Sequence, residues 1–208
     1  MVMDILVAYP LSKSELKFPA RKYYVAFMLC VMLFSGGMMP TYFIVAKTGL
    51  IDTIWSLILP GAVPIFNCIV LMNFFRGIPE ELEESATLDG ANPLQVLIRI
   101  SLPISKPSIA TATLFSLITH WNSWFDVYIY NPSGRFDTLQ MYLRKILLDS
   151  EAASKLMNDQ KKYEAMKNLT TSSVRAATTM IVTIPIVCVY PFFQKYFVSG
   201  ITIGAVKG

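Results

Sequence analysis

The sequence predicts an all-α membrane protein, a polytopic helix bundle with four full spans and the end of another. Of its 208 residues, 54% are hydrophobic and 15% are charged, with a mean hydropathy of +0.49. Soluble domains carry about 25% charged residues, and disordered chains are poor in hydrophobic ones. The charges also divide the chain into long apolar blocks. Buried helices of a soluble bundle normally keep one polar face, and these blocks do not.

Four uncharged blocks are long enough to cross a bilayer. They predict spans at about residues 23–46, 53–75, 107–126 and 176–198. A hydrocarbon core about 30 Å thick needs about 20 helical residues, because each adds about 1.5 Å. The apolar segment at residues 5–12 is too short. It is either an interfacial start or the tail of a helix that begins earlier.

The loop between the second and third predicted spans, residues 76–106, carries helix signals. Pro79 suits the first position of a helix, and Gly90 suits the left-handed conformation that ends one. An acidic run suits the positive helix N-terminus and comprises Glu80, Glu81, Glu83 and Glu84. These signals predict a short helix that ends at a glycine elbow.

A second short helix is expected after the elbow. Asn92 can cap it, with Pro93 in its first position and Gln95 placed for a variant of the capping box. We expect this helix to end before Pro103, because the residue before a proline is disfavoured in helical conformation.

The segment from Glu84 to Pro103 resembles the EAA motif, E-A-A-x3-G-x9-I-x-L-P. That motif belongs to the inner-membrane permeases of binding-protein-dependent ABC importers. Ser85 stands where the motif has its first alanine, and a small serine is expected to preserve close packing. The matching positions are Glu84, Ala86, Gly90, Ile100, Leu102 and Pro103. The alternative is an incidental amphipathic hairpin at the membrane surface.

The resemblance implies a mechanical role for the loop. In this family a short helix docks in a groove of the ATPase subunit, so Glu84, Ser85 and Ala86 would lie on the docking helix and Gly90 at the elbow. The second helix would be anchored to the membrane by Ile100, Leu102 and Pro103. Most of the acidic run is interpreted as solvated helix face, with salt bridges to the ATPase as the alternative.

The resemblance covers essentially the whole chain and points to the carbohydrate-importing branch, similar to maltose-type and Gram-positive oligosaccharide permeases. The similar segments are residues 8–12, 34–37, 40–42, 120–125 and 203–208. It implies a single transmembrane domain over residues 1–208, of the type I importer class. Members usually have six spans, so the first span and most of the second are expected to be missing here.

Partners and location follow from the same resemblance. It implies a second homologous permease subunit, a pair of ATP-binding subunits, an extracellular substrate-binding lipoprotein, a carbohydrate substrate and membrane lipid. The chain would be multi-pass in a bacterial plasma membrane, with the coupling loop and the C-terminus cytoplasmic. The predicted segments on each side of the membrane contain nine Lys and Arg residues, so this count does not favour either orientation. The loop at residues 127–174 would then be external, either resting on the bilayer or contacting the binding protein.

Polar and aromatic side chains near span ends are candidates for the substrate pathway. The end of the third span contains Trp121, Asn122, Trp124 and Asp126. On a continuous helix Asn122 and Asp126 would share a face. An interfacial aromatic belt is the alternative for the tryptophans. Asn67 in the second span lies near Pro60 and Pro64, which predict a kinked or broken helix; helix–helix hydrogen bonding is its alternative role.

Other classes of function are weakly supported. The sequence has no G-x-x-x-x-G-K-[ST] motif, so we expect no enzyme activity and ATP hydrolysis in a separate subunit. One histidine and three cysteines form no ligand cluster, so no metal or cofactor is expected, and scattered cations do not favour nucleic-acid binding. An ion-coupled secondary transporter is the alternative, although it would normally place ionisable residues in mid-span.

Overall fold

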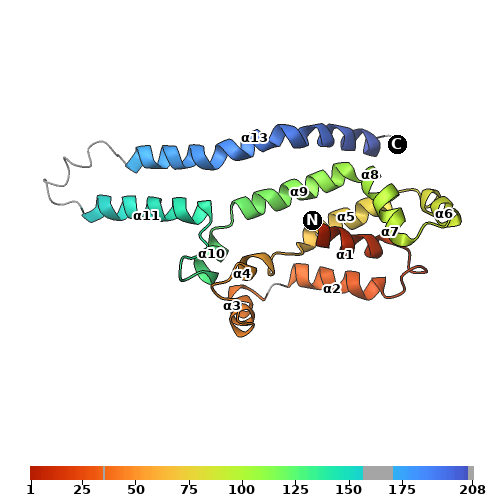
Figure 1. Ribbon diagram of the computed structural model, residues 1–208, viewed down its shortest axis with the longest axis horizontal. Coiled ribbons are helices and arrows are strands. Elements are labelled where there is room, and N and C mark those ends of the chain that lie inside the picture. Colours follow the sequence, from red (N-terminus) through yellow and green to blue (C-terminus); the bar gives the residue numbers. More distant parts are fainter. Residues whose placement is uncertain (35, 157–170, 206–208) are drawn as a thin grey trace. The chain divides into compact units, whose positions relative to one another are not determined.

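The computed structural model describes residues 1–34, 36–156 and 171–205 (Figure 1). Throughout these residues the chain forms helices joined by turns, without strands, as the sequence predicts. The chain divides into two compact units. The first comprises residues 1–41, 59–117 and 192–208, and the second comprises residues 42–58 and 118–191.

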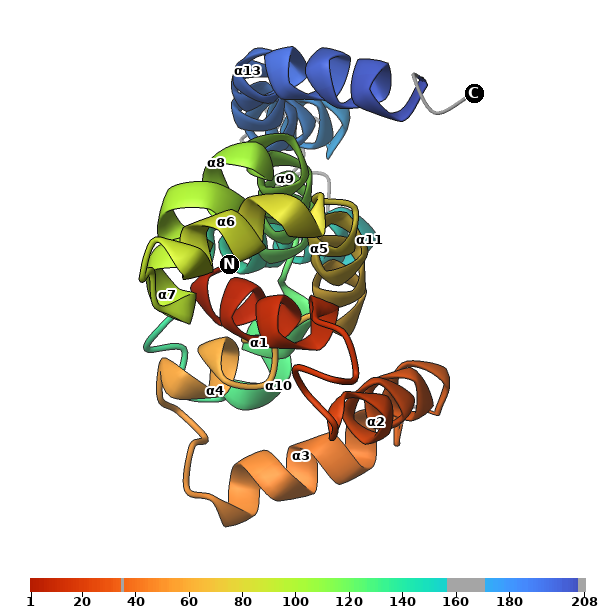
Figure 2. The same ribbon diagram turned by 90° about the vertical axis from the view of Figure 1, so that its right-hand side faces the viewer.

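The first unit is built around α1 (Val2–Ser12) and α5 (Ile65–Arg76), which lie side by side (Figures 1 and 2). The rings of Tyr9 and Phe75 meet edge to face, with their centroids 5.7 Å apart. Helix α2 (Arg21–Leu33) and the first part of α9 (Lys106–Trp121) belong to the same unit. The buried cluster of this unit comprises Ala8, Tyr9, Leu11, Leu71, Met72, Phe75, Ile78, Leu97 and Ala112. The partly buried Val25 and Met28 of α2 pack against it.

The second unit contains α4 (Trp55–Ile58), α10 (Phe125–Tyr130), α11 (Leu139–Leu156) and most of α13 (Thr171–Ala205). The loop before α4 is tied to the end of α10: the Asp52 amide donates to the Tyr130 carbonyl at 2.9 Å, and Oδ1 of Asp52 accepts from the Ser133 amide at 3.0 Å. Both views place α4 beside α10 (Figures 1 and 2).

The helices only partly coincide with the apolar blocks. Within the described residues, one helix segment, Ser173–Gln194, is long and apolar enough to cross a membrane by itself. The first block forms two helices, α2 and α3 (Met38–Lys47), which pass the same test only when they are taken together. Helix α9 has 16 residues. The span limits given above therefore stay predictions.

The prolines act differently in two of these blocks. Between α4 and α5 the helix is broken, as predicted, and Pro64 stands at the N-cap of α5. A proline has no N–H group, so it suits the beginning of a helix, where no such bond is lost. Helix α13, by contrast, runs through both Pro185 and Pro191 without ending.

Candidate functional site

The polar loop after α5 begins with helix α6 (Glu80–Leu88), which has Pro79 at its N-cap rather than at its first helical position. Three glutamates in the first turn, Glu80, Glu81 and Glu83, face the positive end of the helix dipole. The helix ends in a Schellman motif: the Ala91 amide donates to the Ala86 carbonyl at 2.9 Å, and the Gly90 amide donates to the Thr87 carbonyl at 3.0 Å.

Gly90 forms the predicted elbow. Its φ is +84°, in the left-handed region that favours glycine. A Cβ at this position would meet nothing within 4 Å, so the backbone conformation, and not space, requires the glycine. The same motif ends α3, where Gly49 has a φ of +69° and equally open surroundings.

Helix α7 (Pro93–Val96) starts with the predicted capping box. The Gln95 amide donates to Oδ1 of Asn92, and the Asn92 amide donates to Oε1 of Gln95, both at 2.9 Å. Pro93 takes the first helical position. The elbow and the cap together set the direction in which the chain returns from α6.

The end expected for this second helix was wrong. The chain continues from α7 through a π-helical turn, η1 (Leu97–Ser101), into α8 (Leu102–Ile104), which contains Pro103. In the π-helical turn the Leu102 amide donates to the Leu97 carbonyl, one residue further back than in an α-helix. A proline ring clashes with the carbonyl four residues before it, and the wider turn makes room for Pro103.

Two ion pairs hold α6 against the segment that follows α1. Lys13 pairs with Glu83, which also accepts from the Ser101 hydroxyl at 3.4 Å. Lys17 donates to Glu80 at 2.6 Å, and this hydrogen bond lowers the pKa of Glu80 below its ordinary value. Two of the four acids in the run thus have partners within this chain.

Lys13 and Lys17 were missed by the sequence reasoning. They lie 70 and 63 residues before their partners, Glu83 and Glu80. The one sequence signal for this contact is that the two short segments carry residues of opposite charge. The ammonium of Lys13 also lies 3.9 Å from the ring centre of Tyr9, which places it over the end of α1.

The opposite side of the loop is exposed and partly apolar. Glu84 and Ser85 are exposed, and the Ser85 hydroxyl donates to the Glu81 carbonyl at 2.8 Å, so it needs no external partner. Leu88 is 89% exposed, and Leu94 and Ile98 are more than half exposed. Ala86, Ile100 and Leu102 are half-buried and Pro103 is exposed. Exposed apolar side chains of this kind occur at protein-contact surfaces and at membrane-contact surfaces.

Among the pathway candidates, Asn67 lies in the first unit and is 4% exposed. Its amide donates to the Ser116 hydroxyl at 2.8 Å and to the Ala112 carbonyl at 3.4 Å, both on α9. These bonds join two helices, which is the alternative role considered for this residue.

The other four candidates lie in the second unit. Helix α9 ends at Trp121, and α10 begins at Phe125, so the shared helical face expected for Asn122 and Asp126 does not exist. Asn122 donates to its own helix at the Ile118 carbonyl, and Asp126 accepts from Ser123 at 3.1 Å. Both side chains belong to exposed residues.

The two tryptophans have different surroundings. The indole N–H of Trp121 donates to the Val182 carbonyl of α13 at 3.2 Å. The ring of Trp124 carries the Arg144 guanidinium 3.5 Å from its centre and lines a cavity of about 450 Å³. Other lining residues of this cavity include Gln140, Arg175, Thr178, Thr179 and Thr183.

Apolar helices, one of them long enough to cross a membrane, and a polar loop that carries an exposed helix suit a membrane component. Residues 18–203 match the model of the family described as binding-protein-dependent transport system inner membrane component, and the chain belongs to this family.

Relatives agree with this assignment. The chain is 40% identical over its whole length to a polygalacturonan/rhamnogalacturonan transport system permease protein, YtcP, of Bacillus subtilis, and covers 71% of it. It is 43% identical over 97% of its length to Protein LplC of the same organism, and covers 66% of it.

A solved structure is also similar. A bacterial ABC transporter involved in the import of the acidic polysaccharide alginate superposes with a TM-score of 0.78 and 30% identity. The match covers 94% of this chain and 68% of that one. The all-α permease fold and the family resemblance drawn from the sequence are thereby confirmed.

Proposed function

We propose that this chain is a permease subunit of a bacterial ABC importer that takes up oligosaccharides, and that residues 76–106 couple it to an ATPase subunit. Of the similar proteins named above, one is a permease protein of a polygalacturonan/rhamnogalacturonan transport system, and another is an ABC transporter involved in the import of the polysaccharide alginate. Similar permeases are named for trehalose and for melibiose, raffinose and stachyose. The names of all four of these proteins include a carbohydrate substrate.

One observation carries the coupling role: α6 is exposed on one side and attached to the rest of its unit on the other. Glu84, Ser85 and Leu88 face outward. Lys13 and Lys17 connect α6 to the end of α1, and α7, η1 and α8 connect it to α9. A partner that displaces α6 therefore also displaces α1 and α9, because these contacts connect them to α6.

The proposal includes the other subunits of such an importer. A second homologous permease completes the pathway, a pair of ATP-binding subunits hydrolyses ATP, and an extracellular lipoprotein delivers the sugar. The loop at 76–106 and the C-terminus lie on the cytoplasmic side of the plasma membrane. Residues of the second unit around Trp124, including Trp121, Asn122 and Asp126, contribute to the sugar pathway, because stacking rings and hydrogen-bonding groups suit a carbohydrate. For Asn67, the bonds to α9 favour helix packing.

The test is Gly90→Pro in the assembled transporter, with Gly49→Pro as the matched control. Both glycines occupy the same position of a Schellman motif, donate an equivalent bond and have open surroundings. A proline requires a φ near −65°, so the local cost is similar. We expect Gly90→Pro to insert normally into the membrane but to lose the ATPase subunit or sugar uptake, while Gly49→Pro retains both. Wild-type uptake by Gly90→Pro would contradict the coupling role.

A further inference from the structure

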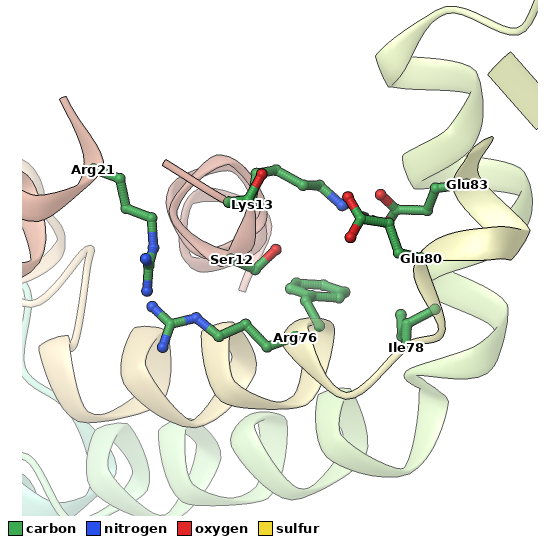
Figure 3. A pocket seen from close by; sticks show the side chains of 9 residues that line it. Ser12, Lys13, Arg21, Arg76, Ile78, Glu80 and Glu83 are labelled. Carbon is green, nitrogen blue, oxygen red and sulfur yellow. Dashed lines mark hydrogen bonds and ion pairs between the residues drawn. The ribbon is translucent and has the colours of Figure 1, made fainter. Parts of the chain in front are cut away.

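A cavity of about 310 Å³ lies between the first turn of α2, the end of α5 and the start of α6 (Figure 3). Arg21, the first residue of α2, and Arg76, the last residue of α5, point toward one another across it (Figure 3). The remaining lining residues are Ser12, Lys13, Ser14, Phe75, Ile78, Glu80 and Glu83.

The two arginines face each other without a carboxylate partner. Both acids of the lining are occupied, Glu83 by Lys13 and Glu80 by Lys17. Nε of Arg21 donates to the Leu11 carbonyl at 2.8 Å, and the recorded contact of Arg76 is from Nη2 to the Met72 sulfur at 3.5 Å. Among the described residues neither arginine forms an ion pair. Arg21 is half-buried and Arg76 is exposed, so solvent screens part of the repulsion between the two guanidinium groups, and an anion between them would remove the rest.

The position of the cavity indicates where that anion comes from. Arg21 and Arg76 stand at the ends of two apolar segments, the level at which a chain leaves the hydrocarbon core. The neighbouring Tyr23 and Tyr24 are 77% and 56% exposed, which is typical of side chains at the lipid interface. The N-terminus of α2 has no side-chain cap at Ala20 and adds its positive dipole end.

We propose that this cavity binds the phosphate group of an anionic phospholipid, with Arg21 and Arg76 as its donors. Guanidinium forks match phosphate oxygens in bidentate geometry. The cavity adjoins the Lys13–Glu83 pair, so a bound lipid would brace the joint between α1, α5 and α6. The lining shares Lys13, Glu80 and Glu83 with the joint used in the coupling proposal. The two proposals are distinguished by their readouts, because the ligand here is a lipid and the partner there is an ATPase subunit.

The probe is phosphatidylglycerol retained by the purified transporter complex and counted by native mass spectrometry, after reconstitution in phosphatidylcholine with and without phosphatidylglycerol. We expect Arg21→Gln/Arg76→Gln to retain phosphatidylglycerol at least tenfold more weakly. The control Arg135→Gln removes an exposed arginine outside both the cavity and the loop at 76–106, and should retain phosphatidylglycerol as wild type does. Phosphatidylglycerol should also raise the unfolding midpoint of the wild-type complex and not that of the double variant.

Three results would overturn the proposal. The first is equal phosphatidylglycerol retention by the double variant and Arg135→Gln. The second is inorganic phosphate at millimolar concentration reproducing the whole stabilisation in phosphatidylcholine alone, which would assign the site to free phosphate. The third is loss of the ATPase subunit from the double variant with lipid retention unchanged, which would assign the arginines to a carboxylate of that partner. Arg21→Lys/Arg76→Lys keeps both positive charges and should retain more phosphatidylglycerol than the Gln double variant and less than wild type. This intermediate retention would show that the loss in the Gln double variant is not caused by misfolding.

Discussion

Lys17, in the segment after α1, donates a 2.6 Å hydrogen bond to Glu80 in the first turn of α6. With the neighbouring Lys13–Glu83 pair, this contact joins the polar loop to the segment that follows α1, more than 60 residues earlier in the chain. The Lys13–Glu83 pair is the more buried of the two, with side chains 17% and 12% exposed. Partial burial protects it from salt, whereas the exposed Lys17–Glu80 pair is screened.

The first prediction concerns the pKa of Glu80. Its hydrogen bond to Lys17 holds that pKa below the ordinary 4.5, so the pair stabilises the attached α6 above about pH 4.5 and loses this effect as the pH falls through the lowered pKa. The pKa of Lys17 is raised above 10.5, mainly by the same bond, so its contribution is lost only at higher pH. Lys17→Gln should return the Glu80 pKa toward 4.5 in a carboxyl-carbon NMR titration. Lys22→Gln is the control; an unchanged Glu80 titration in Lys17→Gln would show that the pair does not form.

A second prediction concerns the capping box of α7. Asn92→Ala should cost about 1 kcal/mol of local stability, because it removes the acceptor for the Gln95 amide. Amides of residues 94–100 should then exchange with solvent roughly fivefold faster. Gln95→Glu keeps an acceptor for the Asn92 amide and should preserve protection. Equal exchange in Asn92→Ala and wild type would mean that packing alone holds α7.

The parts of the loop at 76–106 that could be predicted are those set by signals local in the sequence. The Gly90 elbow and the Asn92 cap depend on residues within a few positions of each other, and both formed as expected. The π-helical turn before Pro103 could not be predicted in this way. Val96, which precedes the turn, and Ser101, its last residue, are buried, and this burial favours continuation of the helix.

Contacts between distant segments were beyond the sequence reasoning. The charges of Lys13 and Glu83 predict that each is solvated, and only the packing of α1 against α5 brings them together. The end of α9 at Trp121 is a different case. Asn122 and Ser123 are weak helix formers whose side chains bond to nearby groups, so they carried a signal for the break. This signal for a helix break was overlooked because the block as a whole is apolar.

A third prediction separates packing from transport at Asn67. Asn67→Ala and Ser116→Ala should each destabilise the protein, and the double variant should lose about 0.6 kcal/mol less than the sum, the size typical of helix–helix hydrogen bonds in membranes. Unfolding in mixed micelles measures these differences. The KM for sugar uptake should stay within about twofold of wild type. A large rise in KM with additive stability changes would instead place Asn67 in the pathway.

The last prediction concerns Trp124, whose ring lines the cavity of the second unit and stacks with Arg144. If sugar stacks on this ring, Trp124→Ala should raise the KM for uptake about tenfold, which corresponds to about 1.4 kcal/mol, and Trp124→Phe should raise it less. Trp55→Ala is the matched control, because Trp55 is 55% exposed on α4 and does not line the cavity. Uptake assays in vesicles loaded with ATP, with saturating binding protein, measure both. An equal effect of the two alanine substitutions would favour an interfacial belt of tryptophans, since a belt anchors the protein in the bilayer wherever its rings are placed and does not depend on a sugar contact.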